Sequence, residues 1–269
     1  MREWTVEREG IRLAVAELGD SALPAAVIAH GVGSCREFVA ACFARPLLEA
    51  GFQLVTYDLR GHARSTPLRD PEHHALEEHA ADLAAVADAV GARLIGGISL
   101  GGHAATLLAT SRPEVGGLLV ALPGWVGAPT VAAALNAAAA DEVAAVGIDG
   151  ALARMAADES AQNWVLDEVR ASWSRHDPAS LVAALRAAAL TTTPDHATLS
   201  HVAAPTGIAA VDDDMAHPVP AAQALADAIP NARLATISLF SMATDRSVLG
   251  AAAVQAWRAA TSQHRPERA

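Results

Sequence analysis

The sequence predicts one α/β domain: a mostly parallel, eight-stranded sheet with helices on both faces and an inserted helical cap. The chain has 269 residues, a length that suits a single α/β domain with a modest insertion better than two separate domains. Short apolar runs alternate with segments of helical periodicity, and this alternation produces right-handed crossovers between parallel strands. We therefore assign residues 1–127 and 201–262 to the core, 128–200 to the cap and 263–269 to a tail.

The first half of the chain supplies most of the expected strands. Trp4–Arg8 and Ile11–Leu18 alternate in polarity on either side of Gly10, which predicts an antiparallel hairpin. Short apolar runs bounded by turn residues predict buried strands at Ala25–Ala29, at Phe52–Tyr57 and in the run that ends at Ile98. Helical periodicity predicts helices over 35–50, 77–90 and 101–111.

The second half begins with a predicted strand at Leu118–Leu122 and then departs from the alternation. Residues 128–200 are helix-rich and delay the next strand, so we interpret them as a cap over the site. The remaining predicted elements are a strand at Thr206–Val211, a helix over 219–228, a strand at Arg233–Ile237 and a helix over 247–260.

The composition excludes several function classes. A formal charge of −11 argues against nucleic acid or an anionic membrane as the main partner. All 19 basic residues are arginine, so Schiff-base chemistry, pyridoxal phosphate and a P-loop lysine are impossible here. We expect a small-molecule substrate or ligand, with no cofactor, no metal, no nucleic acid and no membrane as partner.

The cysteines and the uncharged stretches favour a cytoplasmic protein. Cys35 and Cys42 fall in one predicted helix, where a rise of about 1.5 Å per residue places them roughly 10 Å apart, too far for a disulfide. The N-terminus lacks an apolar signal core. Residues 115–140 carry no charge, but glycines and prolines interrupt them, so buried elements explain them better than a membrane span.

A serine in a glycine-rich turn is the strongest functional signal. Ser99 stands in Gly97-Ile98-Ser99-Leu100-Gly101, after an apolar run and before a predicted helix. This is the context of a nucleophile elbow, a sharp strand-to-helix turn that presents a hydroxyl at the end of a sheet. The flanking glycines fit, because the turn is crowded and a Cβ on either side would clash.

Further motifs accompany the elbow in a fixed order. They are His30-Gly31, Tyr57-Asp58-Leu59-Arg60-Gly61-His62 with Ser65, and Pro205-Thr206 leading to Asp212-Asp213-Asp214. With the elbow, they make nearly the whole chain resemble the α/β-hydrolase superfamily. The resemblance implies Ser99 as nucleophile and the backbone N–H groups of Val32 and Leu100 as the oxyanion hole.

The resemblance also implies an acid on the loop after the penultimate strand. Asp214 aligns with it and Asp213 is the alternative; the acid would orient an imidazole and stabilise the imidazolium. We interpret Asp58, Arg60, His62 and Arg64 as an ionic and hydrogen-bonded brace, and His30 as a structural hydrogen-bond donor beside the oxyanion turn.

The general base is the open question. The family's histidine follows the last strand, where Met242 stands in this chain, and a thioether cannot take the serine proton. No histidine occurs between His217 and His264. Three histidines could be the general base: His217 beyond Asp214, His103 in the helix after Ser99, and His264 in the tail. The fourth possibility is that the protein has no general base.

These observations predict a hydrolase of an ester, thioester or lactone with a small apolar substrate. Ser99 would attack, Asp214 would be the acid and His217 the best candidate base, in a pocket lined partly by Trp125 and Trp164. Because the family histidine is missing, two other functions stay open: a catalytically silent ligand-binding or scaffold protein, and a lyase or cyclase on the same fold. The sequence leaves the oligomeric state open.

Overall fold

A computed structural model of the chain describes residues 1–157 and 163–263. Its sheet has eight strands in the order β1-β2-β4-β3-β5-β6-β7-β8. Only the pairs β1–β2 and β2–β4 are antiparallel, which confirms the predicted mostly parallel sheet and its N-terminal hairpin. The strands are β1 Arg2–Arg8, β2 Ile11–Leu18, β3 Ala25–Ala29, β4 Gln53–Tyr57, β5 Leu94–Ile98, β6 Leu118–Ala121, β7 Thr206–Asp212 and β8 Ala232–Ser238.

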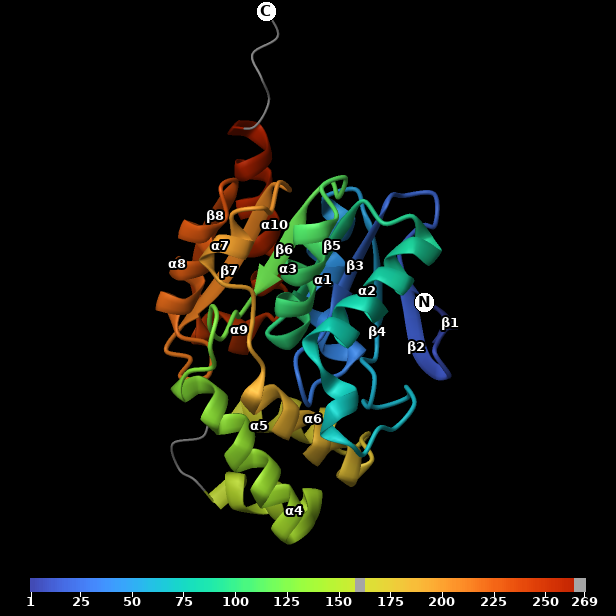
Figure 1. The fold of residues 1–269 in the computed structure, drawn as a ribbon, viewed down its shortest axis with the longest axis vertical. Helices are drawn as coiled ribbons and strands as arrows, with labels where there is room; N and C mark the ends of the chain where they lie inside the picture. Colours follow the sequence, from blue (N-terminus) through green and yellow to red (C-terminus); the bar gives the residue numbers. More distant parts are fainter. Residues whose placement is uncertain (158–162, 264–269) are drawn as a thin grey trace, which may run out of the picture.

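Helices follow most of the parallel strands, as Figure 1 shows. They are α1 Arg36–Glu49, the short 3₁₀ turn η1 Pro71–His74, α2 Leu76–Val90, α3 Leu100–Ser111, α4 Val131–Ala157, α5 Asn163–Trp173, α6 Pro178–Leu190, α7 His196–Leu199, α8 Val219–Ala228, α9 Leu239–Thr244 and α10 Ser247–Gln263. α4 is broken at Gly147, whose φ of 73° interrupts the helical backbone.

Side chains of the central strands alternate between two apolar layers. In β3, Val27 packs in a core formed with α2, α3 and α8, whereas Ile28 packs in a core formed with α1 and α10. Parallel strands buried on both faces are nearly continuous apolar runs, and all five residues of β3 are buried. The predicted three-layer arrangement is therefore confirmed.

The order of the strands locates a crevice. β4 pairs with one side of β3 and β5 with the other, so the connections leave β3 in opposite directions. Ligands bind in open α/β sheets at such a switch point, beyond the carboxyl ends of the strands. The turn after β3 and the elbow after β5 meet there.

Helices α4, α5 and α6, here called the helical segment, lie between β6 and β7 in the chain and beyond one end of the sheet (Figure 1). They have a small apolar core of their own that includes Trp173, Leu181 and Leu185. Val32 from the turn after β3 packs against this core. The helical segment thus covers the end of the sheet at which the crevice opens.

The segment after β8 differs from the sequence prediction. The short helix α9, which the sequence did not predict, directly follows β8 and buries Met242 against the core. Ser238 caps it by accepting a hydrogen bond from the Ser241 N–H. Gln263, the first residue of the predicted tail, is the last residue of α10, and His264 with the rest of the tail lies outside the described residues. Within those residues, no helix combines the length and the apolar character that a bilayer span requires.

Candidate functional site

Ser99 lies at a strained turn between β5 and α3. Its φ of 50° and ψ of −116° fall in a region that side chains other than glycine rarely adopt. The turn closes tightly, because a Cβ at Gly97 would come within 2.2 Å of the Gly101 carbonyl carbon, and one at Gly101 within 2.5 Å of the His30 oxygen. The backbone therefore has the geometry that the elbow motif predicts.

The structure brings Ser99 together with two residues of one loop. His217 Nε2 lies 3.0 Å from Ser99 Oγ, and His217 Nδ1 lies 2.8 Å from Asp214 Oδ2. Since the carboxylate only accepts, Nδ1 donates to it, and Nε2 is free to accept the serine proton. The three side chains form a continuous hydrogen-bonded chain, although the histidine precedes the final strand rather than following it.

The loop after β7 is built to hold both groups. Asp214 Oδ1 accepts from the Ala216 N–H at 2.9 Å, an Asx-type turn that folds the chain back and aims His217 at the serine. Burial alone would raise the pKa of Asp214, but its hydrogen bond to His217, the imidazole charge and the Ala216 and His217 N–H groups hold that pKa below its usual value. The alternative acid, Asp213, is exposed at a residue with φ of 65°.

The two backbone N–H groups predicted as oxyanion donors belong to segments that border Ser99. Leu100 is the first residue of α3, so its N–H has no acceptor within the helix. Val32 belongs to the turn after β3, where a Cβ on the preceding Gly31 would lie 3.2 Å from Ser99 Cβ. Neither N–H donates to another group in the described part of the chain. Both N–H groups are thus without an acceptor among the described residues, and both belong to segments that border the serine.

Two other buried histidines near the elbow form hydrogen bonds with other groups. His103 is buried and its Nε2 accepts from the Gly124 N–H at 3.3 Å, while its ring stacks at 5.4 Å on Trp125. Burial, with the nearby charge of His217, lowers the pKa of His103 to about 3. His30 bonds to backbone groups through both nitrogens. Among the described histidines, only His217 contacts Ser99.

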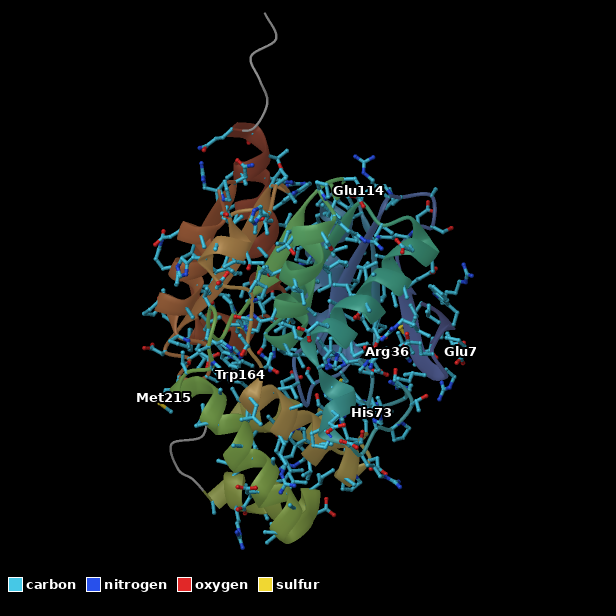
Figure 2. All side chains as sticks on the ribbon, in the orientation of Figure 1. Glu7, Arg36, His73, Glu114, Trp164 and Met215 are labelled. Carbon is cyan, nitrogen blue, oxygen red and sulfur yellow. The ribbon has the colours of Figure 1, made fainter. Side chains whose placement is uncertain are left out.

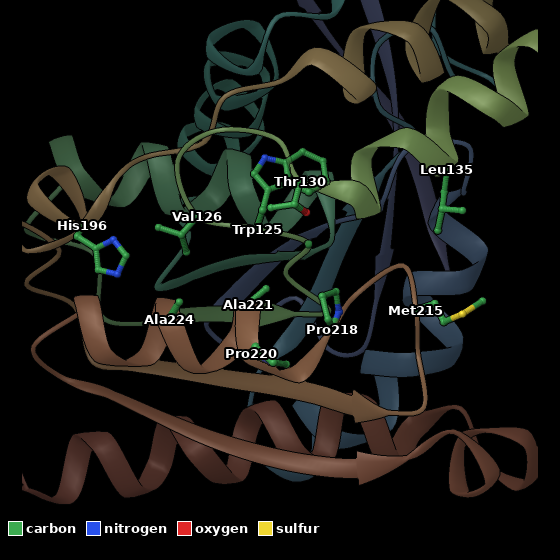
Figure 3. A pocket seen from close by; sticks show the side chains of 11 residues that line it. Trp125, Val126, Thr130, Leu135, His196, Met215, Pro218, Pro220, Ala221 and Ala224 are labelled. Carbon is green, nitrogen blue, oxygen red and sulfur yellow. The ribbon is translucent and has the colours of Figure 1, made fainter.

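An apolar groove of about 590 Å³ adjoins the loop that carries Asp214 and His217. It runs along α8, with Leu135 and Met215 at one end and His196 at the other (Figure 3). The sequence predicted a pocket lined partly by Trp125 but not its extension along α8, although Met215, an apolar residue that is 85% exposed in an aspartate-rich loop, was an available signal (Figure 2). Its lining residues are Gly124, Trp125, Val126, Thr130, Leu135, His196, Met215, Pro218, Pro220, Ala221 and Ala224.

Of the two tryptophans expected to line a pocket, only Trp125 does so. Its indole N–H donates to the Thr191 carbonyl at 3.0 Å, so it joins the β6 loop to the end of the helical segment. Trp164 packs instead against the core formed with α1 and α10, with the Arg246 guanidinium 4.1 Å above its ring. Trp164 therefore does not line this groove, because the start of α5 turns its ring toward the core formed with α1 and α10.

No group of three His, Cys, Asp or Glu side chains suited to a metal ion is found within residues 1–157 and 163–263. Both cysteines are buried and unpaired. Burial raises the pKa of each thiol, that of Cys42 to beyond the physiological range. A thiolate nucleophile is therefore disfavoured at either position.

Comparisons with solved structures agree with this fold. A hydrolase from Pseudomonas aeruginosa PA01 superimposes with a TM-score of 0.75 at 24% identity, over 94% of this chain and 97% of that one. A thermophilic esterase from Thermogutta terrifontis superimposes with a TM-score of 0.71 at 23% identity, over 88% of this chain and 90% of that one. For the enol-lactonase from Burkholderia xenovorans LB400 the TM-score is 0.70 at 17% identity, over 87% of this chain and 90% of that one.

The family comparison covers most of the sequence. Residues 21–242 match the family described as serine aminopeptidase, S33. The matched region runs from before β3 to α9 and includes the elbow, both turns and the loop after β7. The chain therefore belongs to this family of α/β-hydrolases.

Proposed function

We propose that this protein hydrolyses an ester, thioester or lactone of a small apolar substrate, with Ser99 as the nucleophile. The observation that carries the proposal is the chain of hydrogen bonds from Ser99 Oγ through His217 to Asp214, at 3.0 and 2.8 Å. A serine hydroxyl needs an adjacent base, and the base in turn needs a group that orients it. His217 and Asp214 meet both requirements.

The reaction follows from these positions. Ser99 Oγ attacks the carbonyl carbon while His217 Nε2 takes its proton, and the carbonyl oxygen becomes an oxyanion facing the Val32 and Leu100 N–H groups. The C–O or C–S bond to the leaving group then breaks as His217 returns the proton to that group. Water, deprotonated by His217, attacks the acyl-serine ester, and the acid product leaves with Ser99 regenerated.

The helical segment acts in this proposal as a cap and the groove as part of the substrate site. Trp173 at the end of α5 lies against the turn that carries Val32, since a Cβ at Gly33 would be 3.0 Å from its Nε1. Excluding water there strengthens the oxyanion contacts. The groove begins at residues that flank His217 and is lined mostly by apolar side chains, so it suits an apolar part of the substrate. The esterase and lactonase among the structural neighbours support the same reaction class.

A fluorophosphonate probe tests the proposal, because it labels only an activated serine. We expect wild-type protein to be labelled at one position and Ser99→Ala to be unlabelled and inactive toward p-nitrophenyl acetate. Met242→Leu, which alters the place of the family histidine but not the hydrogen-bonded chain, is expected to be labelled normally. Folded wild-type protein that resists the probe would favour the ligand-binding alternative, whereas full turnover of p-nitrophenyl acetate by Ser99→Ala would exclude Ser99 as the nucleophile.

Narrowing the groove tests its role in substrate binding. Ala221 lines the groove from α8. Ala221→Phe is expected to lower kcat/KM about tenfold for an ester with a long apolar chain, because the added ring would displace roughly two methylenes of that chain from the groove. The value for the acetate ester should stay within twofold. Gln223→Phe adds the same ring to an exposed position of α8 outside the groove and is the matched control. An equal change for both esters contradicts this use of the groove.

A further inference from the structure

Two buried imidazoles join the turn that carries Val32 to a neighbouring turn. The first turn, His30–Gly33, follows β3, and the second turn, Asp58–His62, follows β4. Both rings are fully buried, and their centroids are 5.1 Å apart in an edge-to-face arrangement. Neither ring takes part in the hydrogen-bonded chain at Ser99, so their burial calls for a separate explanation.

The two turns exchange hydrogen bonds through these rings. His30 Nε2 accepts from the Leu59 N–H of the second turn at 2.9 Å, and His62 Nε2 accepts from the Gly33 N–H of the first turn at 3.1 Å. Each Nδ1 bonds within its own turn, His30 to the Gly31 carbonyl at 2.7 Å and His62 to the Arg60 carbonyl at 2.8 Å. Because both Nε2 atoms accept, both rings must carry their proton on Nδ1.

These contacts act on the peptide units on either side of Val32. The Gly31 carbonyl and the Val32 N–H belong to one trans peptide unit, so fixing the carbonyl toward His30 points the N–H the opposite way. The Gly33 N–H, held by His62, belongs to the next unit, and Gly33 has a φ of 70°. The two imidazoles therefore fix both peptide planes that set the direction of the Val32 N–H.

We propose that His30 and His62 form a reciprocal clasp, which positions the Val32 N–H as an oxyanion donor and requires both imidazoles as Nε2 acceptors. This role rests on the proposed function of Ser99. The residues are positioning residues, since neither touches the reacting atoms. A peptide that rotated away would remove one preorganised donor, and such a loss costs about 10²–10³-fold in kcat.

The surroundings keep the clasp in place. His176, which follows α5, packs 5.1 Å from the His62 ring, and His74 from η1 packs at 6.3 Å. Glu37 of α1 and the side chains of Asp58 and Arg64 are the neighbouring charged groups, and they pair with one another and with Arg36 rather than with either ring. The helical segment thus meets the clasp through His176.

A nearby buried histidine provides a matched control. His79 of α2 is also fully buried, yet neither of its ring nitrogens has a hydrogen-bond partner within the described residues. His79→Phe changes burial as much as His62→Phe does but removes no hydrogen bond. His62→Gln keeps an acceptor near the Nε2 position, so it can restore the bond to Gly33.

The test measures kcat and KM for p-nitrophenyl acetate in folded variants. We expect His62→Phe to lower kcat about 100-fold with KM within threefold, His62→Gln to recover at least tenfold of that loss, and His79→Phe to keep kcat within threefold. A folded His62→Phe with wild-type kcat, or an equal loss in His79→Phe, overturns the clasp. If Ser99→Ala remains active, it is the proposed function that fails.

A second measurement needs no variant. In ¹⁵N-histidine NMR spectra of the wild-type protein at neutral pH, the clasp requires His30 and His62 to be Nδ1–H tautomers with unprotonated Nε2. An Nε2–H tautomer for either ring overturns the proposal, whatever the activities show. The result also remains decisive if His62→Phe fails to fold.

Discussion

His217→Ala is expected to lower kcat toward p-nitrophenyl esters by roughly 10⁴–10⁶-fold while KM changes little. The substitution removes the only imidazole that contacts Ser99 among the described residues, so the hydroxyl loses its proton acceptor. It also leaves the partly buried Asp214 carboxylate without its main hydrogen-bond donor. Activity and the rate of fluorophosphonate labelling should fall together, because both depend on the activated serine.

Met242→Leu is the comparison for this variant. Met242 is 2% exposed in the core beneath β8, and exchange for leucine conserves volume, so we expect a stability cost below about 1.5 kcal/mol and an unchanged kcat. A His217→Ala protein that kept its kcat within tenfold of wild type would remove His217 from the mechanism. Loss of activity in Met242→Leu alone would point to the position after the last strand instead.

Acidification is expected to destabilise the protein strongly between pH 6.5 and pH 5. Burial lowers the pKa of six histidines, and of these His30 and His103 reach about 3. The unfolded state binds protons near pH 6.5 and the folded state does not, so stability is present above that pH and is lost as the pH falls toward the folded values. The six are His30, His62, His74, His79, His103 and His176.

The pKa values of His30 and His103, both near 3, set the size of this effect. From pH 6.5 to pH 5, each of His30 and His103 costs about 1.6 kcal/mol, or about 3 kcal/mol together, against a typical total stability of about 5–15 kcal/mol. The other four act in the same direction. Asp58, whose pKa burial raises, opposes them but is a single group. Urea midpoints at pH 7.5, 6 and 5 measure the sum.

Two variants separate the buried histidines from general charge effects. His79→Phe should flatten the dependence of the urea midpoint on pH, because it removes one buried imidazole that has no hydrogen bond to lose. His201→Gln, at an exposed position, should leave the dependence unchanged. A midpoint that stays constant from pH 7.5 to pH 5 contradicts the prediction.

The sequence predicted the sheet and the elbow because both depend on local signals. Apolar runs of five residues bounded by turn residues, such as Ala25–Ala29 and the run ending at Ile98, are typical of buried strands between helices. The glycines around Ser99 predict a turn that no other residues could make. The sequence also indicated the acid-bearing loop, since it must follow a strand at the same end of the sheet.

The position of the base was harder to predict, because it depends on a non-local contact. Nothing in the sequence around His217 shows that the Asx turn at Asp214 folds this loop back over Ser99. The pattern also did not predict α9, a six-residue helix whose only strong signal is the Ser238 cap. Trp164 was misplaced for a similar reason, since the start of α5 could face either the groove or the sheet.

The close spacing of Asp214 and His217 has a mechanical consequence. The two residues are joined by one short turn, so their separation is fixed by local chain geometry and does not change when neighbouring strands shift. Strand movements alter only the distance from His217 to Ser99, which spans two separate segments. Every side chain of the hydrogen-bonded trio precedes residue 218, and β8, α9 and α10 support the sheet without supplying any of them. A displacement of the loop 212–217 would therefore move Asp214 and His217 together and leave the distance between them unchanged.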